Sequence, residues 1–333
     1  MAASHTGDRF LEELANLGCR VVLLTIDAHR DAARPADAIS ELQSMPAGMT
    51  LQQITNTVTY LARSRKFARI IALDNFNVPI AAELREHLRI PGMGVTTACY
   101  FSDKLAARLK AAQVEMAVPA FTSVSNYDEL RQFMQAVPPP WLLTPRSASC
   151  SSESRRLHES EQVWRALDAL GDFQSGFLLE QSIEGDRIHV DSLTADGTVV
   201  FSAVSPYRAA SAEGVATGEL LPTVQKASSK AEIERLRRSN TALLSSMRMA
   251  RGVTHTEFLR SHATGDVYFM ETSASVDDRC VENMMQDHHG LDLWKEWARL
   301  EVAAMRGERY TLPSFARDRK ALSSSSEGQH RLA

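Results

Sequence analysis

The sequence of 333 residues has the composition of an ordinary soluble globular protein, with 44% hydrophobic and 23% charged residues. Its formal net charge of −4 provides no basic field for nucleic acid or anionic lipid, so we expect neither nucleic acid nor membrane as a partner. The four cysteines lie far apart without a CxxC pair, which disfavours a disulfide framework and fits a reducing cytoplasm. The sequence therefore predicts a cytoplasmic protein of two or three domains.

The first ninety residues alternate between helical and strand patterns. The predicted elements are helices at 8–18, 51–65 and 78–88, and strands at 20–26 and 69–73. This alternation predicts an open α/β sheet. Such a unit normally begins with a strand, whereas this one begins with a helix. We therefore expect a sheet without its usual first strand, with an exposed edge or gap beside residues 21–25. A true start upstream of Met1 is the alternative explanation for such a gap.

The remaining chain changes from mixed elements to a run of strands. Helices are predicted at 98–113, 126–135 (after a Ser125 cap), 160–170, 230–249 and 291–305. Extended segments are predicted at 118–122, 141–146, 177–180, 188–193, 198–204, 253–259 and 267–271, with a polar loop at 205–223. We expect structured regions at 1–90, 91–175 and 176–312, and a disordered tail at 313–333.

The stretch Phe177–Leu193 interrupts two strands with polar residues. Backbone groups at Gln181 and Ile183 could hydrogen-bond the edge of an adenine. The carboxylate of Glu180 could accept from the adenine amino group, and that of Glu184 from ribose hydroxyls. The alternative is a hairpin corner with a polar tip, and spacing alone favours that alternative.

Two strands near the C-terminus each carry one carboxylate. Strand alternation places His255 and Glu257 on one face of the first strand. On the second strand, Phe269, Glu271 and Ser273 share a face. If the strands pair, Glu257 and Glu271 converge, and they repel each other unless protons or a cation lie between them. Oxygen ligands of this kind suit Mg²⁺. Without further evidence we favour the alternative, two edge carboxylates that face water.

Taken in order, these segments resemble the ATP-grasp superfamily, particularly its biotin-carboxylase-like and carboxylate–amine ligase members. The resemblance runs from about residue 91 to residue 303. Asp103-Lys104 is similar to the family's lysine that reaches the nucleotide phosphates. Trp141–Arg146 resembles the strand usually written apolar-apolar-Lys-Pro, and 147–152 the phosphate-covering loop after it. Glu180–Gly185 resembles the adenine hinge.

The resemblance implies an ATP-grasp fold, α/β and α+β, preceded by the α/β unit, with ATP and Mg²⁺ as cofactors. It implies a nucleotide site formed by Lys104, Arg146, Glu180, Gln181, Ile183 and Glu184, and a metal site formed by Glu257, Glu271 and Ser273. It also implies an ATP-dependent ligase that joins a small-molecule carboxylate and an amine through an acyl-phosphate. Residues 205–223 would lie near the acceptor. Whether the chain forms a homodimer is left open.

Several positions depart from the family pattern. Thr144 stands where the family places a lysine, and the loop at 147–152 holds no glycine. Ser273 replaces an asparagine ligand, and Ser275 replaces an arginine. These changes add a second hypothesis, a non-catalytic or weakened homologue that binds nucleotide or a protein partner, and we place the ligase slightly ahead of it.

Overall fold

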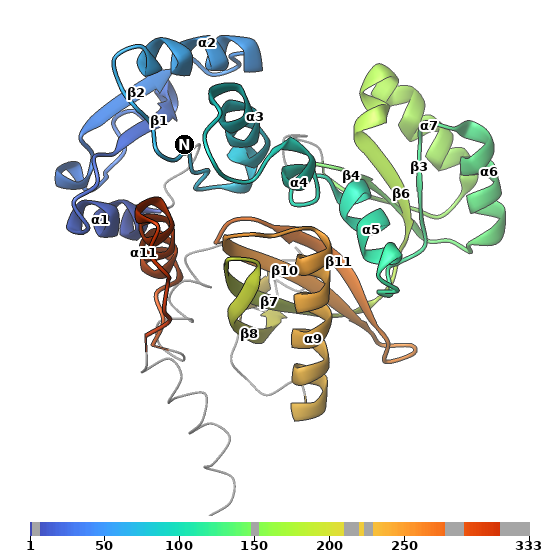
Figure 1. The fold of residues 1–333 in the computed structure, drawn as a ribbon. Helices are drawn as coiled ribbons and strands as arrows, with labels where there is room; N and C mark the ends of the chain where they lie inside the picture. The colour runs from blue at the N-terminus through green and yellow to red at the C-terminus, as the bar shows by residue number, and fades with distance from the viewer. Residues whose placement is uncertain (2–6, 148–152, 210–219, 223–228, 277–289, 314–333) are drawn as a thin grey trace, which may run out of the picture.

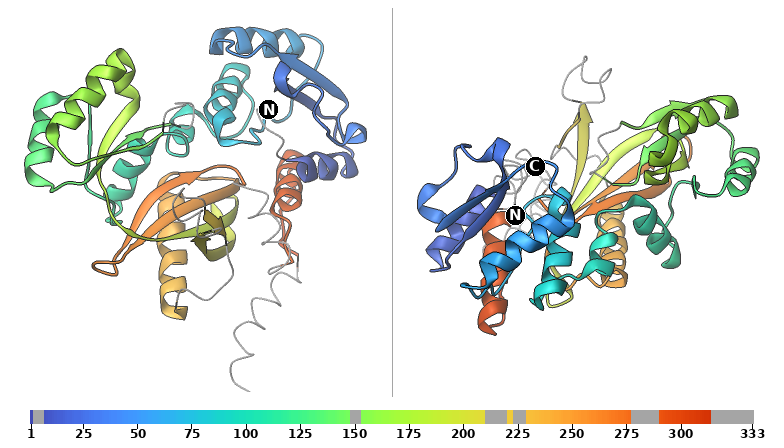
Figure 2. Two further views of the ribbon diagram at one scale, coloured as in Figure 1. Left: turned by 180° about the vertical axis from the view of Figure 1, so that it is seen from behind. Right: turned by 90° about the horizontal axis from the view of Figure 1, so that it is seen from above.

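The computed structural model describes residues 1, 7–147, 153–209, 220–222, 229–276 and 290–313. Three sheets organise these residues, and Figures 1 and 2 show the sheets as separate bodies. The N-terminal unit and the unit around β4 and β6 lie at opposite ends, and the largest sheet lies between and below them in the view of Figure 1. The division at residues 90 and 175 stays a prediction.

The N-terminal unit contains a two-stranded parallel sheet, β1 (Val22–Ile26) and β2 (Glu41–Met45). Its helices are α1 (Asp8–Asn16), α2 (Leu51–Ala62) and α3 (Val78–Leu88). The sequence prediction missed β2. The strand predicted at 69–73 is wrong, because these residues join neither strand and bond instead to Met1, whose ammonium group donates to the Ile71 carbonyl oxygen over 2.7 Å. Residues 2–6 lie outside the described part.

The second unit is built on a four-stranded antiparallel sheet. Its strands occur in the order β3 (Phe121–Ser123), β6 (Phe177–Gln181), β4 (Trp141–Pro145) and β5 (Arg155–Leu157). Helices α6 (Tyr127–Ala136) and α7 (Ser160–Leu170) pack on it through a shared core that includes Leu130, Leu143 and Val163. The α6 cap is Asn126 rather than the predicted Ser125, because the Asn126 side chain accepts from the N–H groups of the first turn.

The largest sheet is antiparallel and has five strands. In spatial order these are β11 (Val267–Ser273), β10 (Gly252–Ser261), β7 (Gly185–Ala195), β8 (Thr198–Ala209) and β9 (Leu220–Pro222). Helix α9 (Lys230–Ser246) covers one face, and α11 (Leu293–Arg306) lies against α1 at the other end (Figure 1). Parts of the predicted loop at 205–223 are therefore strand, while 210–219 and 223–228 lie outside the described residues.

The polar interruption at 182–184 connects two different sheets. Strand β6 belongs to the four-stranded sheet and β7 to the five-stranded sheet. The hairpin alternative is therefore wrong, because consecutive strands of a hairpin pair with each other. The chain must leave one sheet and enter another here, which explains why the apolar pattern stops.

Two short helices connect the units. The helix predicted at 98–113 is divided into α4 (Val95–Cys99) and α5 (Lys104–Gln113). The second is capped by Asp103, whose carboxylate accepts from the N–H groups of Leu105 and Ala106. This cap ends the preceding turn and fixes the direction of α5, which packs on β11.

A β-bulge changes the face of one predicted residue. In the β10–β11 pair, Glu257 lies opposite Glu271 but Phe258 lies opposite Phe269, so Met270 is an extra residue. Phe269 is consequently buried against Phe258 in the core, on the face opposite Glu271. The expectation that Phe269 shares a face with Glu271 is wrong for this reason.

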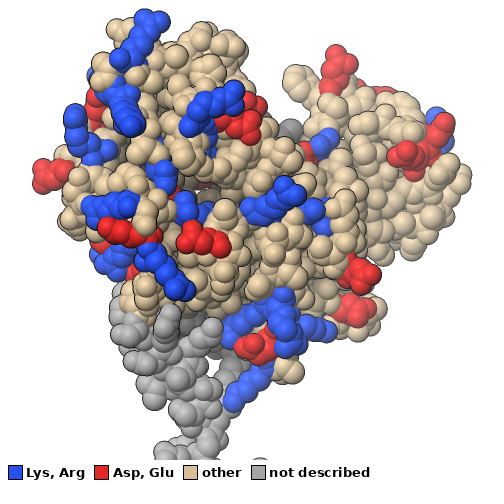
Figure 3. Space-filling model, in the orientation of Figure 1, with Lys and Arg blue, Asp and Glu red and all other residues tan. Residues whose placement is uncertain are grey.

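Charged side chains of both signs are interspersed over the face shown in Figure 3. Within the described ranges, no helix is long and apolar enough to cross a membrane. The absence of a nucleic-acid partner and the cytoplasmic location stay predictions.

The contact between α1 and α11 leads to a prediction about the stability of the protein. Phe10 is 1% exposed, and its ring lies 5.0 Å from that of Trp297. Phe10→Ala should lower the free energy of unfolding by about 3–5 kcal/mol in urea titrations, because it leaves a cavity between the two helices. The matched control is Phe173→Ala, at an 81% exposed side chain, which should change it by less than about 0.5 kcal/mol. Similar losses in the two variants would contradict this packing.

Candidate functional site

Two carboxylates face each other across β10 and β11. Glu257 and Glu271 are directly opposite in the antiparallel register, so they lie on the same face of the sheet. The convergence predicted from strand alternation is confirmed. Both side chains line a cleft of about 460 Å³, together with Ser273 of β11. The cleft therefore contains the oxygen-rich group that the sequence predicted.

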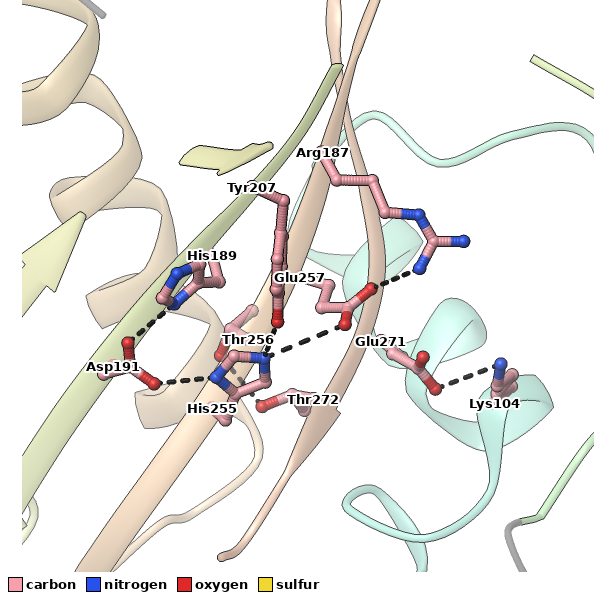
Figure 4. A network of polar contacts seen from close by, with 10 residues as sticks. All are labelled: Lys104, Arg187, His189, Asp191, Tyr207, His255, Thr256, Glu257, Glu271 and Thr272. Carbon is pink, nitrogen blue, oxygen red and sulfur yellow. Dashed lines mark hydrogen bonds and ion pairs between the residues drawn. The ribbon is translucent and has the colours of Figure 1, made fainter. Parts of the chain in front are cut away.

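The cleft also contains two cationic side chains from other elements. Lys104, the first residue of α5, places its Nζ 3.1 Å from a carboxylate oxygen of Glu271 (Figure 4). Arg146, just after β4, forms two hydrogen bonds to Asp103, with its Nη2 at 2.5 Å. The backbone N–H of Lys104 donates to the Arg146 carbonyl oxygen over 2.7 Å. The two sequence-predicted cations are thus held beside each other at one end of the cleft.

Glu257 is surrounded by positively charged or polarisable groups. Burial would raise its pKa, but the adjacent His255 ring and the charges of Arg187 and Lys104 together lower that pKa to about 2. The Nη1 of Arg187 lies 2.9 Å from one carboxylate oxygen, and the Nε2 of His255 lies 3.8 Å from the other. Glu257 is therefore ionised at neutral pH, which is the form that binds a cation.

Behind Glu257, three buried side chains form a polar cluster. Asp191 accepts from the Nδ1 atoms of both His189 and His255, each over 2.7 Å (Figure 4). Burial would raise the pKa of Asp191, but the two imidazoles outweigh it and hold that pKa well below its ordinary value. With Nδ1 turned to Asp191, the His255 ring presents Nε2 to the Tyr207 hydroxyl at 2.9 Å. Asp191 thus fixes the orientation of a ring that lines the cleft.

The residues of this cluster could have been found from sequence alternation. Arg187, His189 and Asp191 are spaced by two on β7, and the β7–β10 register places His189 opposite Glu257 and Asp191 opposite His255. Their contacts cannot be seen on one strand alone, because they arise only when β7 and β10 pair. Tyr207 had no signal, since it falls in the region predicted as loop.

The carboxylate of Glu180 is occupied by protein groups. It forms an ion pair with Arg108 at 2.7 Å, in which the two side chains are 1% and 4% exposed, and it accepts from the Thr144 hydroxyl at 3.1 Å. Arg108 also donates from Nε to the Met270 carbonyl oxygen. Helix α5 and the strands β6 and β11 are thereby joined through one guanidinium group. Arg108 was not predicted as a site residue.

The other hinge residues differ from one another. The Gln181 N–H donates to the Ala120 carbonyl oxygen over 2.8 Å, so the expectation that this N–H faces a ligand is wrong. Ile183 forms no backbone hydrogen bond to another described residue. The Glu184 side chain is 75% exposed and pairs with Arg156 at 3.0 Å. The backbone groups of Ile183 and the carboxylate of Glu184 therefore remain the predicted contacts of the adenine and the ribose.

Comparisons with known proteins place this geometry in a fold family. No family model matches the chain. An L-arginine-specific L-amino acid ligase of Bacillus subtilis is 24% identical over 244 residues, which are 71% of this chain and 58% of that protein. The crystal structure of an L-amino acid ligase from Bacillus licheniformis superposes with a TM-score of 0.72 and 17% identity, covering 90% of this chain and 72% of the other.

Two further solved structures are similar to this chain in fold. The biotin carboxylase domain of Hydrogenobacter thermophilus 2-oxoglutarate carboxylase, a dimer in complex with MgADP, ADP and bicarbonate, gives a TM-score of 0.74 at 16% identity, covering 93% of this chain and 69% of that one. The N5-carboxyaminoimidazole ribonucleotide synthetase of Thermus thermophilus gives 0.71 at 16%, with coverage of 92% and 77%. This chain has the ATP-grasp fold. It spans 58% of the length of the curated relative it matches.

In this ATP-grasp fold, Thr144 lies where the resemblance places a lysine. Its side chain is 3% exposed and bonded to Glu180, so no cation occupies this position. The cations that line the described part of the cleft are Lys104 and Arg146. Residues 148–152, most of the expected phosphate-covering loop, lie outside the described ranges.

The buried Arg108–Glu180 pair makes a prediction about the hinge. Arg108→Met should destabilise the protein by about 3–5 kcal/mol, because it leaves the Glu180 charge buried without its partner. Arg108→Met combined with Glu180→Met should recover most of that loss. Chemical denaturation measures both, with Arg165→Met as control, since Arg165 pairs with Glu161 at an exposed site worth at most about 1 kcal/mol. A double variant no more stable than the single one would contradict the pairing.

Asp191 makes a prediction about acid stability. Its pKa is lower in the folded than in the unfolded state, so its stabilisation is present above pH ~4 and is lost as the pH falls towards the folded pKa. The free energy of unfolding should therefore fall more steeply with decreasing pH below ~4 in the wild type than in Asp191→Asn. Denaturation at several pH values measures the slopes. Asp196→Asn, at a 66% exposed side chain, should keep the wild-type slope, and an unchanged slope in Asp191→Asn would refute the assignment.

Proposed function

We propose that this chain is an ATP-dependent ligase that joins a small-molecule carboxylate to an amine through an acyl-phosphate. The observation that carries the proposal is the pairing of Glu257 and Glu271 in a cleft that also holds Lys104 and Arg146. The similar proteins named above, two amino acid ligases and a synthetase, support this class of reaction. They give no support to the alternative of a non-catalytic homologue.

The side chains in the cleft fit Mg²⁺ as a cofactor. Two carboxylates and a hydroxyl are hard oxygen ligands, and the Ser273 Oγ is a buried atom without a hydrogen-bond partner among the described residues. Glu257 and Glu271 would hold the ion, with Ser273 as the third ligand. When bound, Mg²⁺ would supply neutralisation of the charge that spreads over the phosphoryl oxygens.

The remaining residues of the cleft would bind and orient the nucleotide. Lys104 and Arg146 would steady the phosphates through charge-assisted hydrogen bonds. We propose that Ile183 and Glu184 contact the base and ribose, while Glu180 supports the hinge through Arg108 rather than accepting from adenine. His255 and Tyr207, oriented by Asp191, would line the acceptor side of the cleft.

The overall reaction follows from these roles. A carboxylate oxygen of the substrate bonds to the γ-phosphorus as the bond to ADP breaks. The amine nitrogen then bonds to the acyl carbon, inorganic phosphate leaves, and the amine loses a proton. Closure around the cleft would exclude water, which otherwise hydrolyses the acyl-phosphate. The identities of the two substrates and the oligomeric state are left open.

Nucleotide binding tests the metal assignment. Glu271→Gln should weaken Mg²⁺-dependent ATP binding in calorimetric titration by roughly tenfold or more, because one carboxylate then carries the ion alone, and ~1.4 kcal/mol corresponds to tenfold. Glu257→Gln should do the same. The control Glu161→Gln, on the exposed face of α7, should bind as the wild type does. ATP binding that ignores both cleft substitutions would remove the metal site from the proposal.

Trapping of the intermediate tests the reaction class. With ATP, Mg²⁺, pooled amino acids and hydroxylamine, the wild type should form hydroxamate and release ADP and phosphate in equal amounts, because hydroxylamine attacks an acyl-phosphate in place of the amine. Glu271→Gln should form at least about tenfold less hydroxamate per unit time. Release of AMP and pyrophosphate would point to an adenylate instead. ATP binding without any product would favour the non-catalytic homologue.

A further inference from the structure

A second cavity lies where α3, α11 and the start of β10 approach one another (Figure 1). Its volume is about 230 Å³, and none of the residues that line it also lines the cleft. Val253, which is part of its wall, lies roughly 13 Å along β10 from Glu257 by the rise of a β-strand. The proposed ligase function uses no residue of this cavity.

Arginine side chains dominate the charged lining of this cavity. Four guanidinium groups contribute to it, against one carboxylate, that of Glu301 on α11. The four are Arg69, Arg85, Arg248 and Arg251, and we term the hollow the arginine cavity. They come from three separate parts of the chain, namely residues 69–72, helix α3 and the turn before β10. The lining therefore carries an excess of positive charge.

Arg85 is the most deeply buried of the four arginines. The residue is 8% exposed, and its Nε and Nη1 donate to the carbonyl oxygens of Met93 and Ile70 over 2.9 and 2.7 Å. Gly92 packs so closely on it that a Cβ there would stand 2.6 Å from the Arg85 Cδ. Burial lowers the pKa of the Arg85 guanidinium to about 10, so the group is still charged at neutral pH. The two carbonyl oxygens thus fix its position without neutralising its charge.

Glu301 alone cannot serve all the guanidinium groups around it. Burial raises the pKa of its carboxyl, although the charges of three of the arginines oppose that shift. One carboxylate oxygen lies 3.5 Å from the Arg69 Nε, and the other accepts from the Trp297 Nε1 over 3.4 Å. The Nε atoms of Arg69 and Arg251 are nevertheless buried without a hydrogen-bond partner among the described residues. Because a buried charged donor without an acceptor is costly, the cavity is suited to a second anion.

We propose that the arginine cavity binds a phosphate group, either inorganic phosphate or the phosphate of a small phosphomonoester. A phosphate dianion presents oxygens in several directions, which suits guanidinium groups from three parts of the chain, whereas a carboxylate accepts in one plane. Apolar side chains beside the arginines, including Ile71, Met249 and Trp297, would pack against the organic part of an ester. This inference does not depend on the proposed ligase function.

Calorimetric titration of the intact chain with inorganic phosphate, without nucleotide or Mg²⁺, tests the proposal. The wild type should bind phosphate with a Kd below about 1 mM. Arg69→Gln and Arg251→Gln should each weaken binding by at least about tenfold, because each removes charge-assisted donors. The matched control is Lys104→Gln, which removes a cation of the cleft and should keep the wild-type affinity. Wild-type affinity in both arginine variants would overturn the proposal.

Glu301→Gln separates binding from a loss of folding. The substitution removes the one carboxylate of the cavity, so phosphate should bind at least about threefold more tightly, because less negative charge opposes it. A misfolded chain cannot give such a gain. Circular dichroism checks that the variant is folded, and unchanged or weaker phosphate binding by the folded variant would contradict the proposal.

Two further ligands distinguish the source of the phosphate group. Phenyl phosphate that binds at least about tenfold more tightly than inorganic phosphate would identify a phosphomonoester as the ligand. Equal or weaker binding of phenyl phosphate would identify inorganic phosphate. Malonate carries two carboxylates and should bind more weakly than inorganic phosphate to the wild type. Tighter binding of malonate would overturn the assignment of a phosphate site.

Discussion

Glu257 and Glu271 meet at one register position, and the organisation of the cleft depends on that meeting. Like charges directly opposite each other on an antiparallel pair are destabilising. The fold compensates with cations from two other elements: Lys104 of α5 contacts Glu271, and Arg187 of β7 contacts Glu257. The His255 ring, from the same strand as Glu257, lies beside it. The two carboxylates are therefore tolerated beside each other because α5 and β7 bring positive charge to them.

The position of α5 illustrates how local sequence supports this arrangement. Asp103 caps the helix and also binds Arg146, so one carboxylate sets the helix start and aligns a cation from β4. One turn further, Arg108 reaches Glu180 and the Met270 carbonyl oxygen. Strand β6, the α5 cap and β11 are thus one hydrogen-bonded structure, and a change in any of them should alter the position of Lys104.

The sequence was most informative where polar and apolar residues alternate with a regular period. Alternation on β10 and β11 predicted that Glu257 and Glu271 converge, and the helices α3 and α7 were predicted with their observed bounds. It failed where an element depends on distant contacts. The bulge at Met270 moved Phe269 to the core face, and β2 lacks a clear apolar run because it is a half-exposed edge strand. Arg108 was missed because a buried arginine within a helix reads as a solvated charge until its partner is known.

The most direct test of the account is a crystal structure with a non-hydrolysable ATP analogue and Mn²⁺ in place of Mg²⁺, located by anomalous scattering. The account predicts metal between Glu257 and Glu271, with Ser273 beside it and phosphate oxygens near Lys104 and Arg146. The nearby cluster of His189, Asp191 and His255 provides a built-in alternative, since its ligand atoms lie within 4.8 Å of one another. Anomalous density at that cluster, with none between the two glutamates, would contradict the central claim.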